Sequence, residues 1–249
     1  MTIGGFIFLH NGVASDYCFE HAVESLAMTC DRVLVADCES TDGTLARLRL
    51  LQKQFPHVEI INLPWKPSPW GKWLRDLGNT MRSQLGTDWW FHLQGDEVVD
   101  LPDASLVRSL IHHPSAGNSF QFERFNFWAS PHLITPVGRV CGNHVVRLAR
   151  IDIPLAGDCE GAMPTPTTLK TSVPIWHYGF MRKAEAFRRK GILMETAYTS
   201  GTYNPVLDTL PEKGIKGLQD CWPVSEALEF TRPHPQFMHK WITDRGHLL

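Results

Sequence analysis

The chain has 249 residues, of which 43% are hydrophobic and 20% charged, a composition that is typical of a folded domain and excludes a disordered tail protein. Its 24 Lys and Arg residues against 26 Asp and Glu residues give a net charge of −2, which excludes a general electrostatic nucleic-acid binder. Six scattered cysteines without a C-x-x-C pair indicate reduced thiols, and no signal peptide or transmembrane segment is recognisable. We therefore expect a cytoplasmic protein.

Strand and helix signals alternate over the first hundred residues. Short apolar runs predict strands over 3–9, 32–36, 58–63 and 89–93. Apolar residues at helical spacing predict three intervening helices: one capped by Ser15 or Asp16, one capped by Asp42, and one over 72–85. Continuous apolar strands joined by helices are typical of a parallel sheet that is covered on both faces.

The second half of the chain is less regular. Alternation with period two predicts a half-exposed strand over 119–128, and Pro, Gly and Thr residues predict a loop over 154–172. The other predicted elements are a helix over 106–112, a strand pair or hairpin over 137–148, a short strand over 173–178 and a helix over 183–196. Because no linker divides the chain, we expect one α/β domain with a C-terminal extension.

Polar residues follow the second predicted strand. Asp37 ends that strand, where ligands bind in open parallel sheets, and its carboxylate can accept hydrogen bonds from a base or a ribose. Gly43 and Thr44 begin a helix whose free N–H groups favour nearby anions. The same residues also fit a plain strand–turn–helix connection in which Asp42 is the N-cap.

Two adjacent acids, Asp96 and Glu97, follow the fourth predicted strand. Their oxygen atoms suit Mg²⁺ or Mn²⁺ with phosphates completing the shell, although they also fit a capped loop. His177 follows the strand predicted over 173–178, and histidine is a common ligand of Mn²⁺ as well as a common structural residue.

Together these segments resemble family 2 glycosyltransferases of the GT-A fold. Residues 33–44 are similar to the family block V-x-D-x-x-S-x-D-G-T, and residues 89–99 are similar to its block D-W-x-x-x-x-D-A-D-E. Asn11 precedes them and His177-Tyr178-Gly179 follows them in the family order, so the resemblance covers roughly residues 3–180. It implies an α/β, Rossmann-like, mostly parallel sheet flanked by helices, with a C-terminal helical or loop extension.

The resemblance implies a domain organisation and a reaction. Residues 1–180 would form the catalytic domain, with a nucleotide-binding half over 1–100 and an acceptor half over 101–180, and residues 181–249 would pack on it. The implied reaction transfers a hexosyl or pentosyl group from a nucleoside diphosphate sugar to an acceptor hydroxyl with inversion. A UDP-sugar is the favoured donor.

The resemblance also implies roles for individual residues. Asp37 would bind the base, the loop at His10 and Asn11 would enclose it, and a Mn²⁺ or Mg²⁺ ion would be held by Asp96 and His177. The implied nucleotide-sugar contacts come from His10, Asn11, Asp37, Ser40, Asp42, Arg75, Asn79, Gln94 and Gly95.

The sequence departs from the family pattern at two points. Gln94 replaces the first acid of the D-x-D motif, which removes a charge and weakens metal binding in principle. No segment matches the acidic motif that supplies the general base, so we place Asp158 first, with Glu160 beside it and Glu123 as a rival. Each of these acids also fits a solvated surface position.

Two other functions remain open. A nucleotidyltransferase is disfavoured because no Gly-rich phosphate loop follows the first strand. A non-catalytic nucleotide- or sugar-binding protein is kept open by Gln94.

The acceptor is the least defined partner. We rank a saccharide first, and a hydroxylated base in DNA second. For the second, Trp65, Trp70 and Trp73 would stack on a base. A basic cluster would then follow the phosphates, although it also fits a solvated helix face: Arg182, Lys183, Arg188, Arg189 and Lys190.

Overall fold

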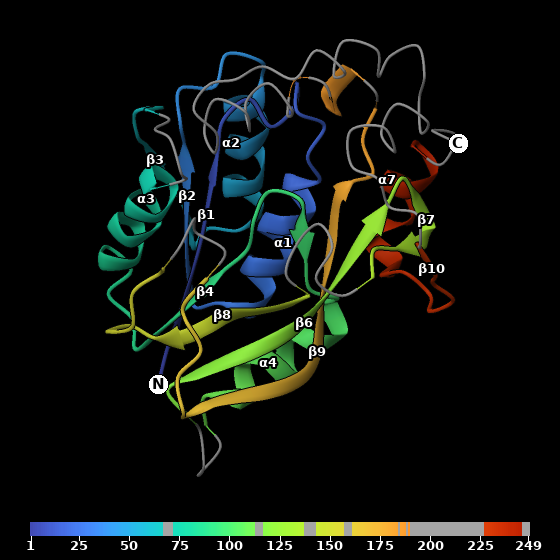
Figure 1. Cartoon of the computed structure of the whole chain (residues 1–249). Coiled ribbons are helices and arrows are strands. Elements are labelled where there is room, and N and C mark those ends of the chain that lie inside the picture. Colours follow the sequence, from blue (N-terminus) through green and yellow to red (C-terminus); the bar gives the residue numbers. More distant parts are fainter. Residues whose placement is uncertain are drawn as a thin grey trace.

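The computed structural model describes residues 1–66, 72–112, 117–136, 143–156, 161–183, 185–187, 189 and 227–245. The helices are α1 (Phe19–Thr29), α2 (Thr44–Gln54), α3 (Lys72–Ser83), η2 (Leu101–Asp103), α4 (Ala104–Leu110), η4 (Gln236–Met238) and α7 (His239–Thr243), of which η2 and η4 are short 3₁₀ helices (Figure 1). Residues 185–187 and 189 are helical as well. The strands are β1 (Ile3–Leu9), β2 (Arg32–Asp37), β3 (Val58–Asn62), β4 (Trp89–His92), β5 (Glu97–Val98), β6 (Ser119–Trp128), β7 (Ser130–Ile134), β8 (His144–Arg150), β9 (Thr168–Phe180) and β10 (Leu228–Glu229).

These strands form one sheet with two differently built halves. The path of paired strands is β10-β7-β6-β8-β4-β1-β2-β3. The strands β4, β1, β2 and β3 are parallel to one another, whereas β8 runs antiparallel to both β4 and β6. The α/β class with a parallel core, predicted from the alternating apolar runs, is confirmed.

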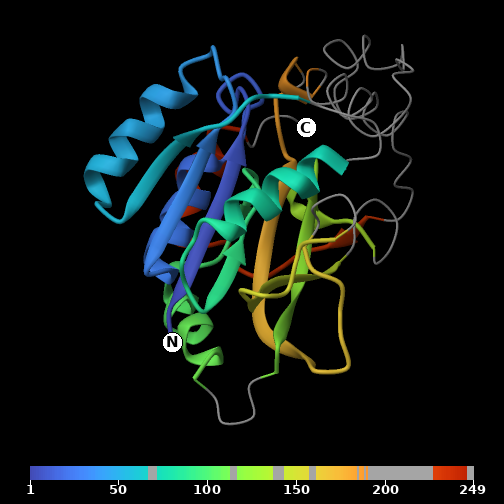
Figure 2. The ribbon, with the colours of Figure 1, turned by 90° about the vertical axis from the view of Figure 1, so that its left-hand side faces the viewer.

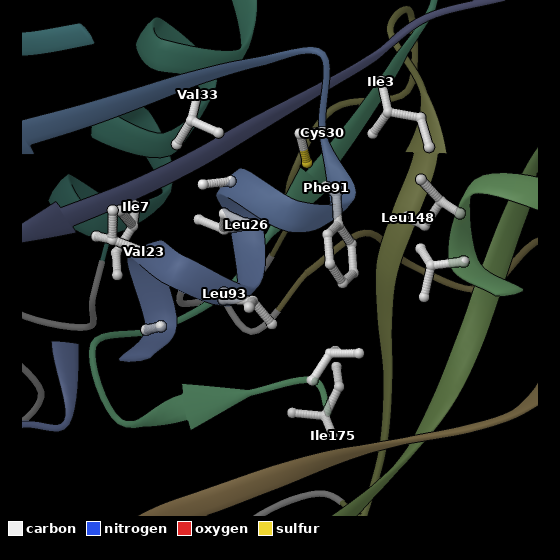
Figure 3. Close-up of a cluster of buried hydrophobic side chains, with 14 of the residues drawn as sticks. Ile3, Ile7, Val23, Leu26, Cys30, Val33, Phe91, Leu93, Leu148 and Ile175 are labelled. Atoms are coloured by element: carbon white, nitrogen blue, oxygen red, sulfur yellow. The ribbon is translucent and has the colours of Figure 1, made fainter. Parts of the chain in front are cut away.

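Helices cover both faces of the parallel strands. Side chains of α1, α2 and α4 pack in one buried cluster with alternate residues of β1 and β2, and Leu77 and Met81 of α3 pack in a second cluster on the other face. In Figure 2, α3 crosses in front of the strands. Figure 3 shows Val23 and Leu26 of α1 beside Ile7 and Val33 in the first cluster. Burial on both faces explains the apolar runs of β1 and β2.

The strand predicted over 119–128 exists as β6, but the expectation that it is half exposed is wrong. Eight of its ten residues are buried, because β6 lies between β8 and β9 in the sheet and its phenylalanines pack in buried clusters. The alternate polar residues Arg124 and Asn126 are 1% and 0% exposed, since they face buried polar partners and not water.

The segment predicted as a loop over 154–172 ends inside a strand. The strand β9 begins at Thr168, five residues earlier than the predicted strand over 173–178, and pairs in parallel with β6. Of the hairpin predicted over 137–148, the structure describes only β8, since residues 137–142 lie outside the described part. Most of the helix predicted over 183–196 also lies outside it.

The C-terminal residues of the described part pack on the antiparallel half. The strand β10 pairs with β7, and Met238 and Trp241 lie in a third buried cluster with Phe127 and Tyr178. Arg245 forms an ion pair with Asp16, which joins α7 to the loop after β1. No helix among the residues that the structure describes is long and apolar enough to cross a bilayer.

Candidate functional site

The carboxyl ends of three parallel strands place several predicted site residues at one edge of the sheet. The strand β1 lies between β2 and β4, with Leu9 opposite Asp37 and Phe6 opposite His92. The residues that follow β1, β2 and β4 therefore begin at neighbouring points. Gly95 is in close contact with the end of β1, because a Cβ at this position would lie 2.7 Å from a methyl carbon of Leu9.

The loops after β1 and β2 are joined by hydrogen bonds. The Asn11 backbone N–H donates to Ser40 Oγ at 2.9 Å, and the Thr41 N–H donates to Asn11 Oδ1 at 2.8 Å. His10 Nδ1 lies 2.6 Å from the Cys38 carbonyl oxygen and so carries the proton, which leaves Nε2 to accept from Asn11 Nδ2 at 2.9 Å. The structure thus brings together His10, Asn11 and Ser40.

Asp37 is a buried carboxylate beside these loops. Its side chain is 3% exposed, and Oδ2 accepts a long hydrogen bond of 3.3 Å from the Ser40 N–H. Among the described residues, Oδ1 has no hydrogen-bond partner although it is buried. Because an unsatisfied buried polar atom is costly, this oxygen is where a ligand with an N–H or O–H group gains most.

Aromatic rings border the same loops. The ring of His10 stacks on Trp65 with centroids 4.2 Å apart and planes 9° apart, and Trp65 meets Trp73 edge to face at 4.6 Å. The Trp65 N–H donates to Glu39, a residue with a left-handed backbone (φ 55°) that non-glycine residues seldom adopt. We call His10, Trp65 and Trp73 the aromatic wall. Trp70 lies outside the described residues.

Three predicted contact residues are engaged elsewhere. Asp42 accepts bonds from Ala14 N and from both the N–H and the hydroxyl of Thr44, so both of its oxygens hold the loops and the start of α2. Burial by itself would raise the pKa of Asp42, but the hydrogen bonds from Ala14 and Thr44 have the larger combined effect. The pKa of Asp42 is therefore lowered. Asn79 exchanges two hydrogen bonds with the backbone of Leu155, and Arg75 forms an ion pair with its neighbour Asp76.

The second part of the site lies where β9 returns beside the end of β4. His177 is opposite Glu97 in the β5–β9 pair, and the Tyr178 N–H donates to the Asp96 carbonyl oxygen at 2.8 Å. The imidazole Nε2 of His177 lies 3.7 Å from Asp96 Oδ1, and both side chains are buried. Burial lowers the pKa of His177, against the opposing effect of Asp96, and so favours the neutral imidazole.

Arg182 contributes a permanent cation to this cluster. Its guanidinium forms an ion pair with Asp96 Oδ2, donates to the carbonyl oxygens of Gly179 and Ser15, and lies 4.1 Å from the Tyr17 ring centroid. The prediction that Arg182 belongs to an exposed basic helix face is wrong, because the residue is 4% exposed. Arg189 is paired with Glu185 on the surface, and Arg188 and Lys190 lie outside the described residues.

A fully buried ion network supports the end of β4. Glu97 accepts from Arg147 at 2.6 Å and from Arg124 at 3.0 Å through Oε1, and from the Gln94 N–H at 2.9 Å through Oε2. Burial alone would raise the pKa of Glu97, but Arg147 and Arg124 hold it at about 2. Glu97 therefore fixes the turn that carries Gln94 and Asp96.

The predicted general bases are differently placed. Glu123 is exposed and lies three residues before Asn126 on β6, so by the two-residue period it points to the opposite face from Asn126 and His177. Asp158 and Glu160 lie outside the described residues, between Ala156 and Gly161, which pair in an antiparallel bridge.

The donors near Asp96 fit a divalent cation. Gly179 leaves room there, because a Cβ at this position would collide with His177 Nε2 and lie 3.1 Å from Asp96 Oδ2. Within the described residues, no three His, Cys, Asp or Glu side chains are placed so that together they could hold a metal ion. The described protein would supply two ligands, Asp96 and His177, and leave other positions to phosphate oxygens, as Mg²⁺ and Mn²⁺ sites commonly do.

Sequence reasoning missed Arg124, Asn126 and Arg147 as members of this site, and it named Arg182 only as part of a basic cluster. The polar positions of β6 carried a signal, since they alternate with phenylalanines. For Arg147 and Arg182 no local pattern distinguishes a buried arginine from an exposed one.

Comparisons with known proteins give a fold-level similarity. No protein-family model matches the chain, and no curated protein sequence matches it. Residues 1–349 of Staphylococcus aureus TarS in complex with UDP are 13% identical over 88% of this chain and 73% of that one, with a TM-score of 0.49. The mannosyltransferase PcManGT from Pyrobaculum calidifontis, in complex with GDP-Man and Mn²⁺, is 13% identical over 99% of this chain and 69% of that one, with a TM-score of 0.42.

A third solved structure comes from another class of enzyme. It is a provisional glucose-1-phosphate thymidylyltransferase from Bacillus anthracis, 11% identical over 81% of this chain and 96% of that one, with a TM-score of 0.46. With similarities this low, function has to be argued from the residues of the site.

Proposed function

We propose that this protein is a nucleotide-sugar-dependent glycosyltransferase. The observation that carries the proposal is the buried and unpartnered Asp37 Oδ1, which lies at the sheet edge beside the hydrogen-bonded loops of His10 and Asn11. A nucleoside offers what this edge lacks, an N–H on the base or an O–H on the ribose. The adjoining aromatic wall is suited to stacking on a base. The family resemblance favours uridine.

The second cluster is suited to the diphosphate. Breaking the bond between sugar and phosphate leaves negative charge on the nucleoside diphosphate, and positive groups nearby stabilise that charge. The guanidinium of Arg182, which forms an ion pair with Asp96, is one such positive group. A Mn²⁺ or Mg²⁺ ion held by Asp96 and His177 would supply further electrostatic stabilisation of the leaving group.

The remaining roles are part of the same proposal. The acceptor half over 101–180 binds a saccharide, and a carboxylate removes the proton of the acceptor hydroxyl as it attacks the anomeric carbon with inversion. We keep Asp158 as the first candidate for this base, followed by Glu160 and then Glu123.

The test of the proposed function is incubation with UDP-, GDP- and dTDP-sugars, each with and without a panel of saccharides, scored for released nucleoside diphosphate. We expect release from one nucleotide class, faster when an acceptor is present. If release is absent for every donor, and none of the nucleoside diphosphates binds, the proposed function is wrong. Release of pyrophosphate from a nucleoside triphosphate and a sugar phosphate would indicate a nucleotidyltransferase instead.

Replacing Asp37 by Asn should weaken UDP binding by about 1.5–3 kcal/mol, the scale of a hydrogen bond to a charged group. The amide keeps the shape of the side chain but removes the negative charge to which the ligand N–H or O–H would donate a hydrogen bond. Calorimetric titration with UDP measures the effect. Asp31→Asn is the matched control, because Asp31 directly precedes the opposite end of β2 and bonds to Ile3 and Arg108. Equal affinities in both variants would remove Asp37 from the site.

The general base should be identified by three separate variants, Asp158→Asn, Glu160→Gln and Glu123→Gln. We expect turnover at saturating substrates to fall by at least about 10²-fold in the variant that removes the base. Because Glu123 points away from His177, we expect Glu123→Gln to keep its activity. Full activity in all three variants would mean that none of these acids accepts the proton.

A further inference from the structure

The histidine of the candidate cation site is held by a chain of two amides, the first of which is buried. His177 Nδ1 lies 2.7 Å from Asn126 Oδ1, and Asn126 Nδ2 donates to Asn143 Oδ1 at 3.2 Å. Asn126 is 0% exposed, and its own backbone oxygen accepts from the Thr135 N–H at 2.9 Å. Because the side chain is buried and its NH₂ group donates to Asn143, its oxygen is directed at His177.

The distances decide which imidazole nitrogen carries the proton. A separation of 2.7 Å to an amide oxygen requires a donor, so Nδ1 is protonated. On the other side of the ring, the 3.7 Å between Nε2 and Asp96 Oδ1 exceeds hydrogen-bonding distance. An Nε2–H group would find in Asp96 a strong acceptor and would be drawn closer, whereas a lone pair gains nothing from a carboxylate oxygen.

We propose that Asn126 is a positioning residue that fixes His177 in the Nδ1–H tautomer, so that the Nε2 lone pair faces Asp96 and is available to a divalent cation. The role of the cation rests on the proposed function, but the tautomer does not. A metal-binding histidine commonly donates its other N–H to a fixed acceptor, which sets the ring orientation and the tautomer. Here the acceptor is a neutral amide from the neighbouring strand β6.

Separate contacts hold the two proposed cation ligands, His177 Nε2 and Asp96 Oδ1, 3.7 Å apart. Gly179 leaves the space next to Nε2 free, and Arg182 holds Asp96 through the other oxygen, Oδ2. A carboxylate that is already fixed by a guanidinium cannot rotate freely toward the imidazole. Asn126 and Arg182 thus position the two ligands independently.

The first experiment is ¹⁵N NMR of the full-length, uniformly labelled protein without metal or nucleotide, with His177 assigned by comparison with His177→Gln. In the wild type we expect a protonated Nδ1 and an unprotonated Nε2. In Asn126→Leu, which removes the acceptor but keeps the volume, the proton should move to Nε2 and bond to Asp96. In Asn126→Asp, which still accepts from Nδ1, the tautomer should remain that of the wild type.

The second experiment is titration of the same proteins with MnCl₂, followed by electron paramagnetic resonance, with and without UDP. We expect Asn126→Leu to bind Mn²⁺ about 10–100-fold more weakly than the wild type, and Asn126→Asp to retain most of the affinity. A residue that only packs in the core would change the stability of both variants without this split.

The outcomes separate the inference from the proposed function. A wild-type spectrum with the proton on Nε2 overturns the inference, and this measurement does not require any variant to fold. An unchanged tautomer in folded Asn126→Leu also overturns it. If the wild type shows the Nδ1–H tautomer but binds neither Mn²⁺ nor UDP, the tautomer assignment stands and the proposed function is wrong.

Discussion

Replacing Glu97 by Gln is expected to lower the free energy of unfolding by about 3–5 kcal/mol, the cost of removing one partner from a buried ion pair. Water cannot solvate the guanidinium groups that lose their carboxylate, because no member of the network is more than 1% exposed: Glu97, Arg124 and Arg147. The carboxylate accepts from two guanidinium groups at Oε1 and from the Gln94 N–H at Oε2. The amide NH₂ of glutamine must face one of them.

Urea denaturation measures this effect, with Glu59→Gln as the matched control. Glu59 also pairs with an arginine, Arg32, but its side chain is 48% exposed, so its loss should cost no more than about 1 kcal/mol. If the two variants lose equal amounts of stability, the buried network does not stabilise the protein as argued.

The difference in stability between the wild type and Glu97→Gln should also depend on pH, and the lowered pKa of Glu97 gives the direction. The pKa of Glu97 is about 2 in the folded protein, below its usual value of 4.5. A carboxyl group whose pKa is lowered by folding stabilises the protein above its unfolded-state pKa, and this stability is lost as the pH falls. The difference in stability between wild type and Glu97→Gln should therefore be full above about pH 5 and narrow steadily toward pH 2. A difference that widens on acidification would contradict the assignment.

Replacing Asp96 by Asn is expected to reduce turnover by about 10²–10³-fold, the scale of losing one preorganised electrostatic contribution, because the cation that would stabilise the leaving diphosphate loses a ligand. Asp96 holds Arg182 by an ion pair and faces the neutral His177, so its loss disturbs the guanidinium and removes one of the two proposed ligands of the cation. Because the buried Arg182 then loses this carboxylate, the variant should also unfold at a lower temperature. Turnover is therefore measured at saturating donor and well below the melting temperature.

Asp100→Asn is the control for this experiment. Asp100 lies four residues further along the chain, and burial raises the pKa of its carboxyl group, so an uncharged side chain is tolerated there. Loss of activity in Asp96→Asn but not in Asp100→Asn supports the proposed role. Equal turnover in both variants, with Asp96→Asn folded, would reduce Asp96 to a structural ion pair.

The sequence by itself determined the parallel half of the fold and part of the edge that carries the candidate site. Runs such as those of β1 and β2 are apolar because both faces of these strands are covered, and this pattern is local. Parallel strands joined by helices must end at one edge, so the proximity of Asn11, Asp37 and the Gln94–Asp96 turn to one another follows from order along the chain.

Only the tertiary structure determined which charged side chains meet in the site. Asp96 and Arg182 are 86 residues apart, and Glu97 meets Arg147 from 50 residues away. No local period records such partners, because an arginine side chain has the same sequence signal whether it faces water or a buried carboxylate. Glu123 and Arg124 are adjacent in an alternating strand and point to opposite faces, and only the packing around β6 determined that Arg124 enters the buried network while Glu123 is exposed.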